Sequence, residues 1–303
     1  MLKTKKFHGV VIPVVTPFTQ TGKIDQATTG RMINFFVDAG TFPFILGTTG
    51  EANSMTLELR SEFVKIVSRY LNGRTMLYVG IADNCLENSL LAAKTYHDLG
   101  ADAFVAHPPY YYPLNEEHLL KYFENLADKL PGPLLIYNIP STTQISLSLK
   151  LIKELSKHPN IKGLKDSERS LERIKLFSEN FYDDKDFSLL SGWAVQSAFA
   201  LNSGFDGIVP STGNIVPRLF QKLYLASRTN ADTAYELQKI VDPIANIHQK
   251  DKLLSQVIPA LKVMMKEKGL CSPHVMPPLL RCTKAEEKQI RDEMNRLNID
   301  QYI

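Results

Sequence analysis

Short apolar runs alternate with longer amphipathic runs along most of the chain. A short apolar run indicates a buried strand, and apolar positions spaced three and four residues apart indicate a helix. The sequence predicts the following strand and helix pairs: 9–15 with 26–39, 42–46 with 56–71, 75–80 with 86–99, 101–106 with 116–130, 134–137 with 147–156, 161–164 with 171–181, 187–190 with 194–202, and 207–209 with 216–227.

These eight strand–helix units predict a closed barrel. Helices between consecutive strands imply parallel pairing with right-handed crossovers. Eight such units within residues 1–229 also match the usual size of a (β/α)8 barrel. The alternative is a doubly wound open sheet, but the sequence carries no dinucleotide-binding fingerprint. We therefore predict an α/β protein with a TIM barrel over residues 1–229.

The pattern changes after residue 229. Helical periodicity continues over 232–248, 253–268 and 284–297, with no strand between these segments. Gly269 and the Pro277-Pro278 pair interrupt the last two. Residues 230–303 are therefore predicted to form a C-terminal helical bundle appended to the barrel.

Composition excludes several functional classes. A net charge of +3 in 303 residues gives no basis for nucleic-acid binding. No apolar stretch approaches the roughly 20 residues that span a membrane, and residues 1–8 lack the apolar core of a signal peptide. Cys85, Cys271 and Cys282 are odd in number and far apart, which is typical of free thiols in a reducing compartment. We expect a cytoplasmic protein with neither membrane nor nucleic-acid partners.

Two side chains at the predicted strand ends carry candidate chemistry. Lys165 follows the sixth strand, at the barrel rim where such enzymes hold their active sites. A desolvated lysine has a lowered pKa, and its free amine attacks carbonyl carbon to form a Schiff base. Tyr137 closes the fifth strand, where a phenol beside the amine can shuttle protons. For either residue alone, a structural role is the ordinary interpretation.

The loop after the second strand adds a candidate anion site. Gly47 and Gly50 flank Thr48 and Thr49, so the backbone can approach a ligand while two hydroxyls and nearby amides hold a small carboxylate. A plain glycine-containing turn is the alternative. Carboxylate holder, proton relay and amine nucleophile together are what a 2-oxo acid needs to become an enamine.

These residues belong to a set of motifs that covers essentially the whole chain. The motifs occupy 9–18 (GVVIPVVTPF), 47–51 (GTTGE), 109–111 (PYY), 137–140 (YNIP) and 163–166 (GLKD). In order and spacing they resemble the dihydrodipicolinate synthase and N-acetylneuraminate lyase superfamily of pyruvate-dependent class I aldolases. The resemblance implies a TIM barrel, Schiff-base chemistry and no cofactor.

The resemblance also implies roles for individual residues. Lys165 matches the lysine that condenses with the keto carbon of pyruvate, and Tyr137 matches the tyrosine that shuttles protons. Thr48 and Thr49 match the pair that binds the pyruvate carboxylate, with Thr48 also in the proton relay. Tyr111 matches a tyrosine that reaches into the neighbouring subunit's site. Family members are dimers of tight dimers, so we expect a homotetramer.

Departures from the family pattern narrow the range of expected substrates. Dihydrodipicolinate synthases carry an arginine where this chain has Thr142, and losing it removes a bidentate carboxylate contact. N-acetylneuraminate lyases carry adjacent Asp and Glu where this chain has Ala194 and Val195, after Trp193. The hydroxyl-bearing run 141–143 instead resembles that of 2-keto-3-deoxy sugar acid aldolases, and hydroxyls suit a polyhydroxy aldehyde.

We therefore predict reversible cleavage of a 2-oxo-3-deoxy or 4-hydroxy-2-oxo acid to pyruvate and an aldehyde. Dihydrodipicolinate synthase, N-acetylneuraminate lyase and 2-keto-3-deoxy acid dehydratase activities remain alternatives on the same imine. The expected catalytic set is Lys165, Tyr137, Thr48 and Tyr111. The expected substrate-binding set is Gly47, Thr48, Thr49, Ser141, Thr142, Gly192 and Val209.

Two hypotheses lie outside imine chemistry. A metal-dependent aldolase would need two or three ligands at the rim, and His107, Glu51, Asp83 and Asp166 have no ligand-like spacing. The other histidines are expected to be solvated or capping: His8, His97, His118, His158, His248 and His274. A pyruvate-binding regulator would keep the carboxylate site and lose the lysine or tyrosine, and both are present.

Overall fold

The computed structural model describes residues 5–302 and contains a closed barrel of parallel strands. The strands pair in chain order, and β1 closes the barrel against β8. Their bounds are β1 (Gly9–Pro13), β2 (Phe42–Ile45), β3 (Tyr78–Gly80), β4 (Ala103–Ala106), β5 (Leu134–Asn138), β6 (Ile161–Asp166), β7 (Ser188–Ser191) and β8 (Gly207–Ile208). The predicted TIM barrel is confirmed.

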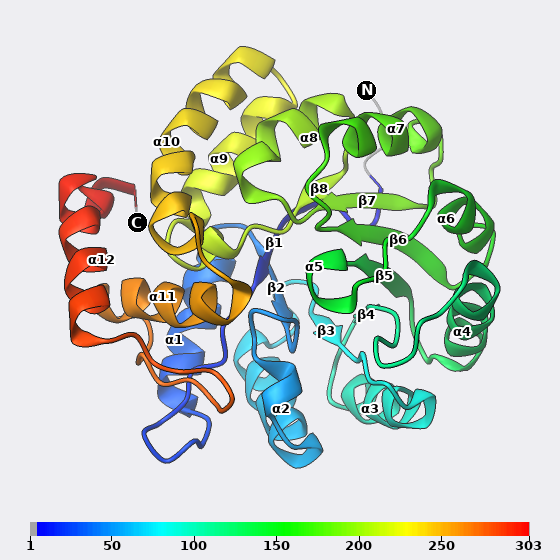
Figure 1. Ribbon diagram of the computed structural model, residues 1–303, viewed down its shortest axis with the longest axis horizontal. Coiled ribbons are helices and arrows are strands. Elements are labelled where there is room, and N and C mark those ends of the chain that lie inside the picture. The colour runs from blue at the N-terminus through cyan, green and yellow to red at the C-terminus, as the bar shows by residue number, and fades with distance from the viewer. Residues whose placement is uncertain (1–4, 303) are drawn as a thin grey trace.

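Helices surround these strands as an outer ring (Figure 1). The α-helices are α1 (Gln26–Asp38), α2 (Leu57–Leu71), α3 (Leu86–Asp98), α4 (Glu116–Lys129), α5 (Pro140–Thr143), α6 (Leu149–Leu155), α7 (Leu171–Phe181), α8 (Ser197–Ser203), α9 (Pro217–Ser227), α10 (Ala231–Gln249), α11 (Leu254–Glu267) and α12 (Lys284–Arg296). Short 3-10 helices are η1 (Ala52–Ser54), η2 (Ala194–Gln196), η3 (Ser211–Asn214) and η4 (Ile299–Tyr302).

Polar side chains fix where most of the long helices begin. At the start of α1, Asp25 accepts a hydrogen bond from the Thr28 amide, and at the start of α4, Asn115 accepts one from the His118 amide. Each such cap satisfies an amide that the helix leaves unpaired, which is worth about 1 kcal/mol. The same type of cap occurs at Thr56, Ser148, Ser170, Asn230 and Thr283.

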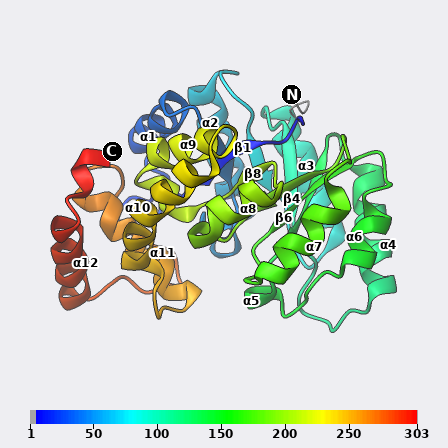
Figure 2. The same cartoon turned by 90° about the horizontal axis from the view of Figure 1, so that it is seen from above.

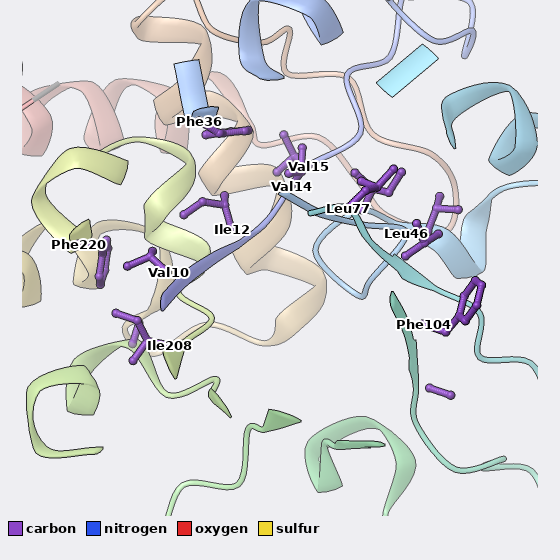
Figure 3. Close-up of a cluster of buried hydrophobic side chains, with 14 of the residues drawn as sticks. Val10, Ile12, Val14, Val15, Phe36, Leu46, Leu77, Phe104, Ile208 and Phe220 are labelled. Atoms are coloured by element: carbon purple, nitrogen blue, oxygen red, sulfur yellow. The ribbon is translucent and has the colours of Figure 1, made fainter. Parts of the chain in front are cut away.

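Successive strand residues face opposite sides, which divides the core into two layers. The inner layer fills the barrel with side chains that include Val11, Phe44 and Tyr78. The outer layer packs the strands against the helices, and Figure 3 shows Val10 of β1 beside Phe220 of α9. The barrel is filled from within, so its interior leaves no room for a ligand, and enzymes of this fold bind substrate at the carboxyl-end rim.

The C-terminal helices pack on one side of the barrel. Helix α10 contacts α8, α9 and η2, and α11 and α12 follow it, away from α4 and α6 (Figures 1 and 2). We propose a boundary at residues 229 and 230 from this arrangement. None of the helices between residues 5 and 302 has the length and apolar character needed to cross a membrane.

His248 on α10 corrects one expectation. It was predicted to be solvated or capping, but its side chain is fully buried, and its Nε2 lies 3.0 Å from the Thr212 hydroxyl. Burial disfavours the charged ring and lowers the pKa of His248 to about 3. The sequence pattern could not indicate this, because α10 buries His248 against η3, a contact that only the tertiary fold creates.

Candidate active site

Strand pairing brings the two principal candidates together. In the register of β5 and β6, Tyr137 lies directly opposite Lys165. The Lys165 Nζ is 3.5 Å from the centre of the Tyr137 ring and 4.9 Å from that of Phe44. Lys165 is the fifth residue of β6, within the strand rather than after it as the sequence predicted. Its position inside the strand holds the amine in the barrel mouth.

The surroundings of Lys165 favour its uncharged form. Its side chain is buried, and burial is the main cause that lowers the pKa of the amine below its ordinary value. Tyr137 opposes this shift because its oxygen and ring attract the ammonium. The lowered pKa increases the fraction of the amine that has the free electron pair that attack on a carbonyl requires.

A cavity of about 350 Å³ opens at the rim. Its walls come from loops after β2, β3 and β4 and from Tyr137 on β5, and they include Phe44, which touches Lys165. Further walls come from Leu254, Ser255 and Ile258 of α11 and from the loop before α12. The sequence did not predict this contribution of the C-terminal helices, because no local motif indicates which barrel loop they cover.

The loop after β2 presents unused hydrogen-bond donors. Within residues 5–302, neither the amides nor the hydroxyls of Thr48 and Thr49 donate a hydrogen bond to the protein. The loop is held by its own turns and by the Thr16 hydroxyl, which donates to the Gly50 carbonyl at 2.6 Å. Two adjacent free amides with two hydroxyls match the needs of a small carboxylate.

Glycine at position 47 is required by close packing. A Cβ there would lie 2.7 Å from the Phe44 ring, which itself contacts Lys165. Any larger residue would displace that ring or move the loop. Gly47 and Thr48 both line the cavity, so the structure brings them together with Tyr137 and Lys165.

Glu51 ends the same loop and anchors the C-terminal region to it. Its carboxylate forms a fully buried ion pair with Lys262 of α11 and accepts a hydrogen bond from the Met276 amide at 2.8 Å. The Lys262 ammonium also donates to the His274 carbonyl at 2.6 Å. Burial raises the pKa of Glu51, and Lys262 opposes that rise. The loop after β2 is therefore connected directly to α11 and to the segment before α12, which form one wall of the cavity.

A second network fixes the strands that carry Tyr137 and Lys165. The following residues, Asn138 and Asp166, face outward and bond to each other at 3.0 Å. Arg173 of α7 donates to the Asp166 carboxylate at 2.6 Å. The Asn138 amide also donates to Glu168 at 2.9 Å, and its oxygen accepts from the Leu147 amide at 3.1 Å. Asp166 and Glu168 thus lie behind the lysine, outside the barrel.

We expect Asn138→Ala to destabilise the protein by about 1–3 kcal/mol, because three partners lose a hydrogen bond: the Asp166 and Glu168 carboxylates and the Leu147 amide. Urea denaturation measures this change. The matched control is Asn180→Ala, where the amide donates only to the Leu176 carbonyl of its own helix at 2.7 Å. Surface changes of that kind stay within about 0.5 kcal/mol. Equal effects of the two substitutions would contradict the network's role.

Tyr111 projects into solvent rather than toward the cavity of its own chain. Its side chain is 75% exposed and packs edge-on against Tyr112, which is 69% exposed, with ring centres 5.1 Å apart. Asn84 holds the backbone of this loop by accepting from the Tyr110 amide at 2.9 Å. An exposed aromatic pair on a fixed loop is an unusual surface feature.

The other predicted binding residues do not line the cavity: Thr49, Ser141, Thr142, Gly192 and Val209. Ser141 and Thr142 lie on α5, a short helix that the sequence analysis missed although Pro140 at its first position is a common start signal. The Thr142 hydroxyl donates to the Ile139 carbonyl at 3.2 Å. Gly192 donates its amide to Asp166, and Val209 is buried in the inner layer with Tyr137. Trp193 packs against the outer core layer.

The cavity residues that were not predicted to bind substrate include His107 and Arg60. His107 follows β4, and Arg60 lies on α2, where its Nε donates to the Met55 carbonyl at 3.1 Å. Among residues 5–302, no three His, Cys, Asp or Glu side chains are grouped as metal ligands.

Comparisons with known proteins agree with this geometry. The chain matches the Dihydrodipicolinate synthetase family over residues 6–297. A 4-hydroxy-tetrahydrodipicolinate synthase of Alkaliphilus oremlandii is 29% identical over 300 residues, covering 97% of this chain and 99% of that protein.

Two solved structures are also similar. Dihydrodipicolinate synthase from Bacteroides thetaiotaomicron has a TM-score of 0.91 and 30% identity, covering 97% of this chain and 100% of that one. The E. coli K12 prophage protein YagE, solved in complex with pyruvate, has a TM-score of 0.91 and 26% identity, covering 97% and 99% of the two chains.

Proposed function

Because this chain belongs to the dihydrodipicolinate synthetase family of pyruvate-dependent lyases, we propose that it cleaves a 2-oxo-3-deoxy or 4-hydroxy-2-oxo acid reversibly. The products are pyruvate and an aldehyde, and the reaction passes through an imine on Lys165. The observation that carries the proposal is the buried Lys165 amine, 3.5 Å from the Tyr137 ring at the edge of the cavity.

In the cleavage direction, the Lys165 amine attacks the keto carbon and the oxygen leaves as water, with Tyr137 supplying and removing protons. The resulting iminium accepts the electrons of the C3–C4 bond while the C4 hydroxyl gives up its proton, which releases the aldehyde. The enamine that remains takes a proton at C3. Water then hydrolyses the imine and frees pyruvate.

The loop after β2 supplies the carboxylate subsite in this proposal. The free amides and hydroxyls of Thr48 and Thr49 support it, because they can bind the pyruvate carboxylate without breaking an existing bond. Thr48 and Tyr137 both line the cavity, which supports a role of the Thr48 hydroxyl in the proton relay. Ser141, Thr142, Gly192 and Val209 would shape the second side of the site.

Condensation of pyruvate with aspartate semialdehyde is the second candidate, favoured by the names of the curated relatives. It requires a cation for the second carboxylate. At the position where the resemblance implies arginine this chain has Thr142, which lies on α5 and bonds its own backbone. A dehydratase outcome would use the same imine on Lys165.

The exposed Tyr111 and Tyr112 pair supports a homotetramer in which this loop meets a neighbouring subunit. Sedimentation equilibrium of the wild-type chain and of Tyr111→Ser tests this assembly. The cytoplasmic location stays a prediction from composition.

Borohydride trapping tests the proposed chemistry. With pyruvate present, reduction of the imine is expected to add one stable pyruvyl-derived group per chain, and peptide mapping is expected to locate it on Lys165. Intact mass after incubation without pyruvate is the control. An adduct on another lysine, or no adduct with pyruvate bound, would refute the assignment. Once trapping with pyruvate has succeeded, screening hydroxyaldehydes and aspartate semialdehyde as condensation partners identifies the second substrate.

A further inference from the structure

His107 occupies an inward-facing position at the end of β4. Along this strand Ala103 and Val105 face the barrel interior, and the strand's two-residue alternation continues to His107. The imidazole lines the cavity, and its centre is 6.4 Å from that of the Tyr137 ring. His107 and Tyr137 therefore border the same cavity.

One ring nitrogen of His107 already forms a hydrogen bond within the protein. Its Nδ1 lies 2.8 Å from the Pro108 carbonyl oxygen, and because a carbonyl only accepts, Nδ1 carries the hydrogen. Burial and the nearby Lys165 lower the pKa of His107, so the ring is neutral near pH 7. In this tautomer Nε2 is an acceptor, and no residue from 5 to 302 is hydrogen-bonded to it.

Among the cavity-lining residues of β3 and β4, none has a polar side chain, and Tyr137 is the polar group that β5 contributes. Gly80 at the end of β3, Ala82 after that strand and Val105 on β4 also line the cavity, and none of the three has a side chain that can bond a substrate oxygen. An acceptor on this small and apolar part of the wall favours a ligand that brings a donor to it.

We propose that His107 Nε2 accepts a hydrogen bond from a hydroxyl on the aldehyde fragment. Tyr137 meets the oxygen at C4, and His107 meets a hydroxyl farther along the chain of the same fragment. The enzyme thereby selects hydroxyaldehydes over their deoxy analogues. This inference rests on the proposed function, since the aldehyde enters the cavity only in the course of that reaction.

The test compares two aldehydes of the same carbon number, glyceraldehyde and propionaldehyde, each condensed with pyruvate. The readout is the ratio of their kcat/KM values, measured for the wild-type enzyme, His107→Val and His107→Gln. The ratio cancels any general effect of a substitution on imine formation, because both aldehydes react with the same pyruvate enamine.

The wild-type enzyme is expected to prefer glyceraldehyde. His107→Val should lower this preference about 10- to 100-fold, the range expected for one hydrogen bond lost in a buried site. His107→Gln places an amide oxygen near the position of Nε2 and should restore most of the preference. An unchanged ratio in His107→Val, or no recovery in His107→Gln, would overturn the proposal.

A separate measurement distinguishes this result from failure of the proposed function. Exchange of the pyruvate methyl hydrogens for deuterium in D2O, followed by NMR, reports enamine formation without any aldehyde. If the wild-type enzyme catalyses no exchange, both the proposed imine chemistry and the proposed role of His107 are refuted. If exchange proceeds but the ratio of kcat/KM values is the same in the wild-type enzyme and the His107 variants, only the proposed role of His107 is refuted.

Discussion

Lys165→Met is expected to reduce pyruvate turnover and methyl deuterium exchange by at least about 10⁴-fold. In the proposed mechanism the amine forms the covalent bond through which every later step passes, and removing such a nucleophile leaves only the effect of binding. Pyruvate itself should still bind, because the proposed carboxylate subsite of Thr48 and Thr49 is unchanged. Exchange monitored by NMR measures the loss, and titration of pyruvate binding by calorimetry measures what remains.

The same substitution is expected to raise stability. Folding buries the Lys165 amine and lowers its pKa, so the unfolded chain holds the proton more tightly. This cost to stability is full below the pKa of the folded protein and disappears as pH rises through it toward the unfolded value. The gain from Lys165→Met, measured by urea denaturation, should therefore shrink between neutral and alkaline pH.

Lys162→Met is the matched control, since Lys162 lies on the same strand and borders a separate cavity lined by Lys5, Lys6 and Phe7. It should leave deuterium exchange within about twofold of wild type, as expected for a change away from the reacting groups. Comparable loss of exchange in both variants would mean that β6 tolerates no substitution and that Lys165 is not special.

Lys262→Met is expected to destabilise the protein by about 3–5 kcal/mol, because it leaves the buried Glu51 carboxylate without its counter-charge. The change also frees the segment around His274 and Met276, which the pair holds against the loop after β2. The KM for pyruvate should rise as the amides of Thr48 and Thr49 lose their fixed position. Chemical denaturation and steady-state kinetics measure the two effects.

The double variant Glu51→Gln with Lys262→Met separates charge from packing. Removing both charges should recover most of the lost stability, because neither group is then buried with an unpaired charge. The Glu51 pKa is already raised by burial, and without Lys262 it rises further. The deficit of Lys262→Met alone should thus be greatest above the raised pKa of Glu51 in the folded variant, and it should fade as pH falls through that pKa toward the value of the unfolded carboxyl.

A pH-independent deficit in Lys262→Met, with no recovery in the double variant, would show that lost packing around Lys262 dominates. Lys266→Met provides the matched control on the same helix. Lys266 pairs with Glu287 at 2.9 Å but is 39% exposed, so its loss should cost no more than about 1 kcal/mol.

The amino-acid sequence by itself determined the barrel and the pair at its centre. Apolar runs of strand length alternate with amphipathic helices eight times, and that repetition has few topological solutions. Tyr137 and Lys165 end neighbouring strands of any such barrel, so their proximity follows from the order of the strands. The position of the Thr48 and Thr49 loop at the same rim also follows from the order of the strands, because the loop comes directly after the second one.

Tertiary structure alone decided which other residues reach the cavity. His107 could be placed in the cavity only once the inward face of β4 was known, because a single strand pattern does not say which face is inside. The burial of His248 against Thr212, the pairing of Glu51 with Lys262 and the wall formed by α11 all join segments far apart in the chain. Local patterns encode periodicity and turns, whereas such contacts depend on how finished elements pack together.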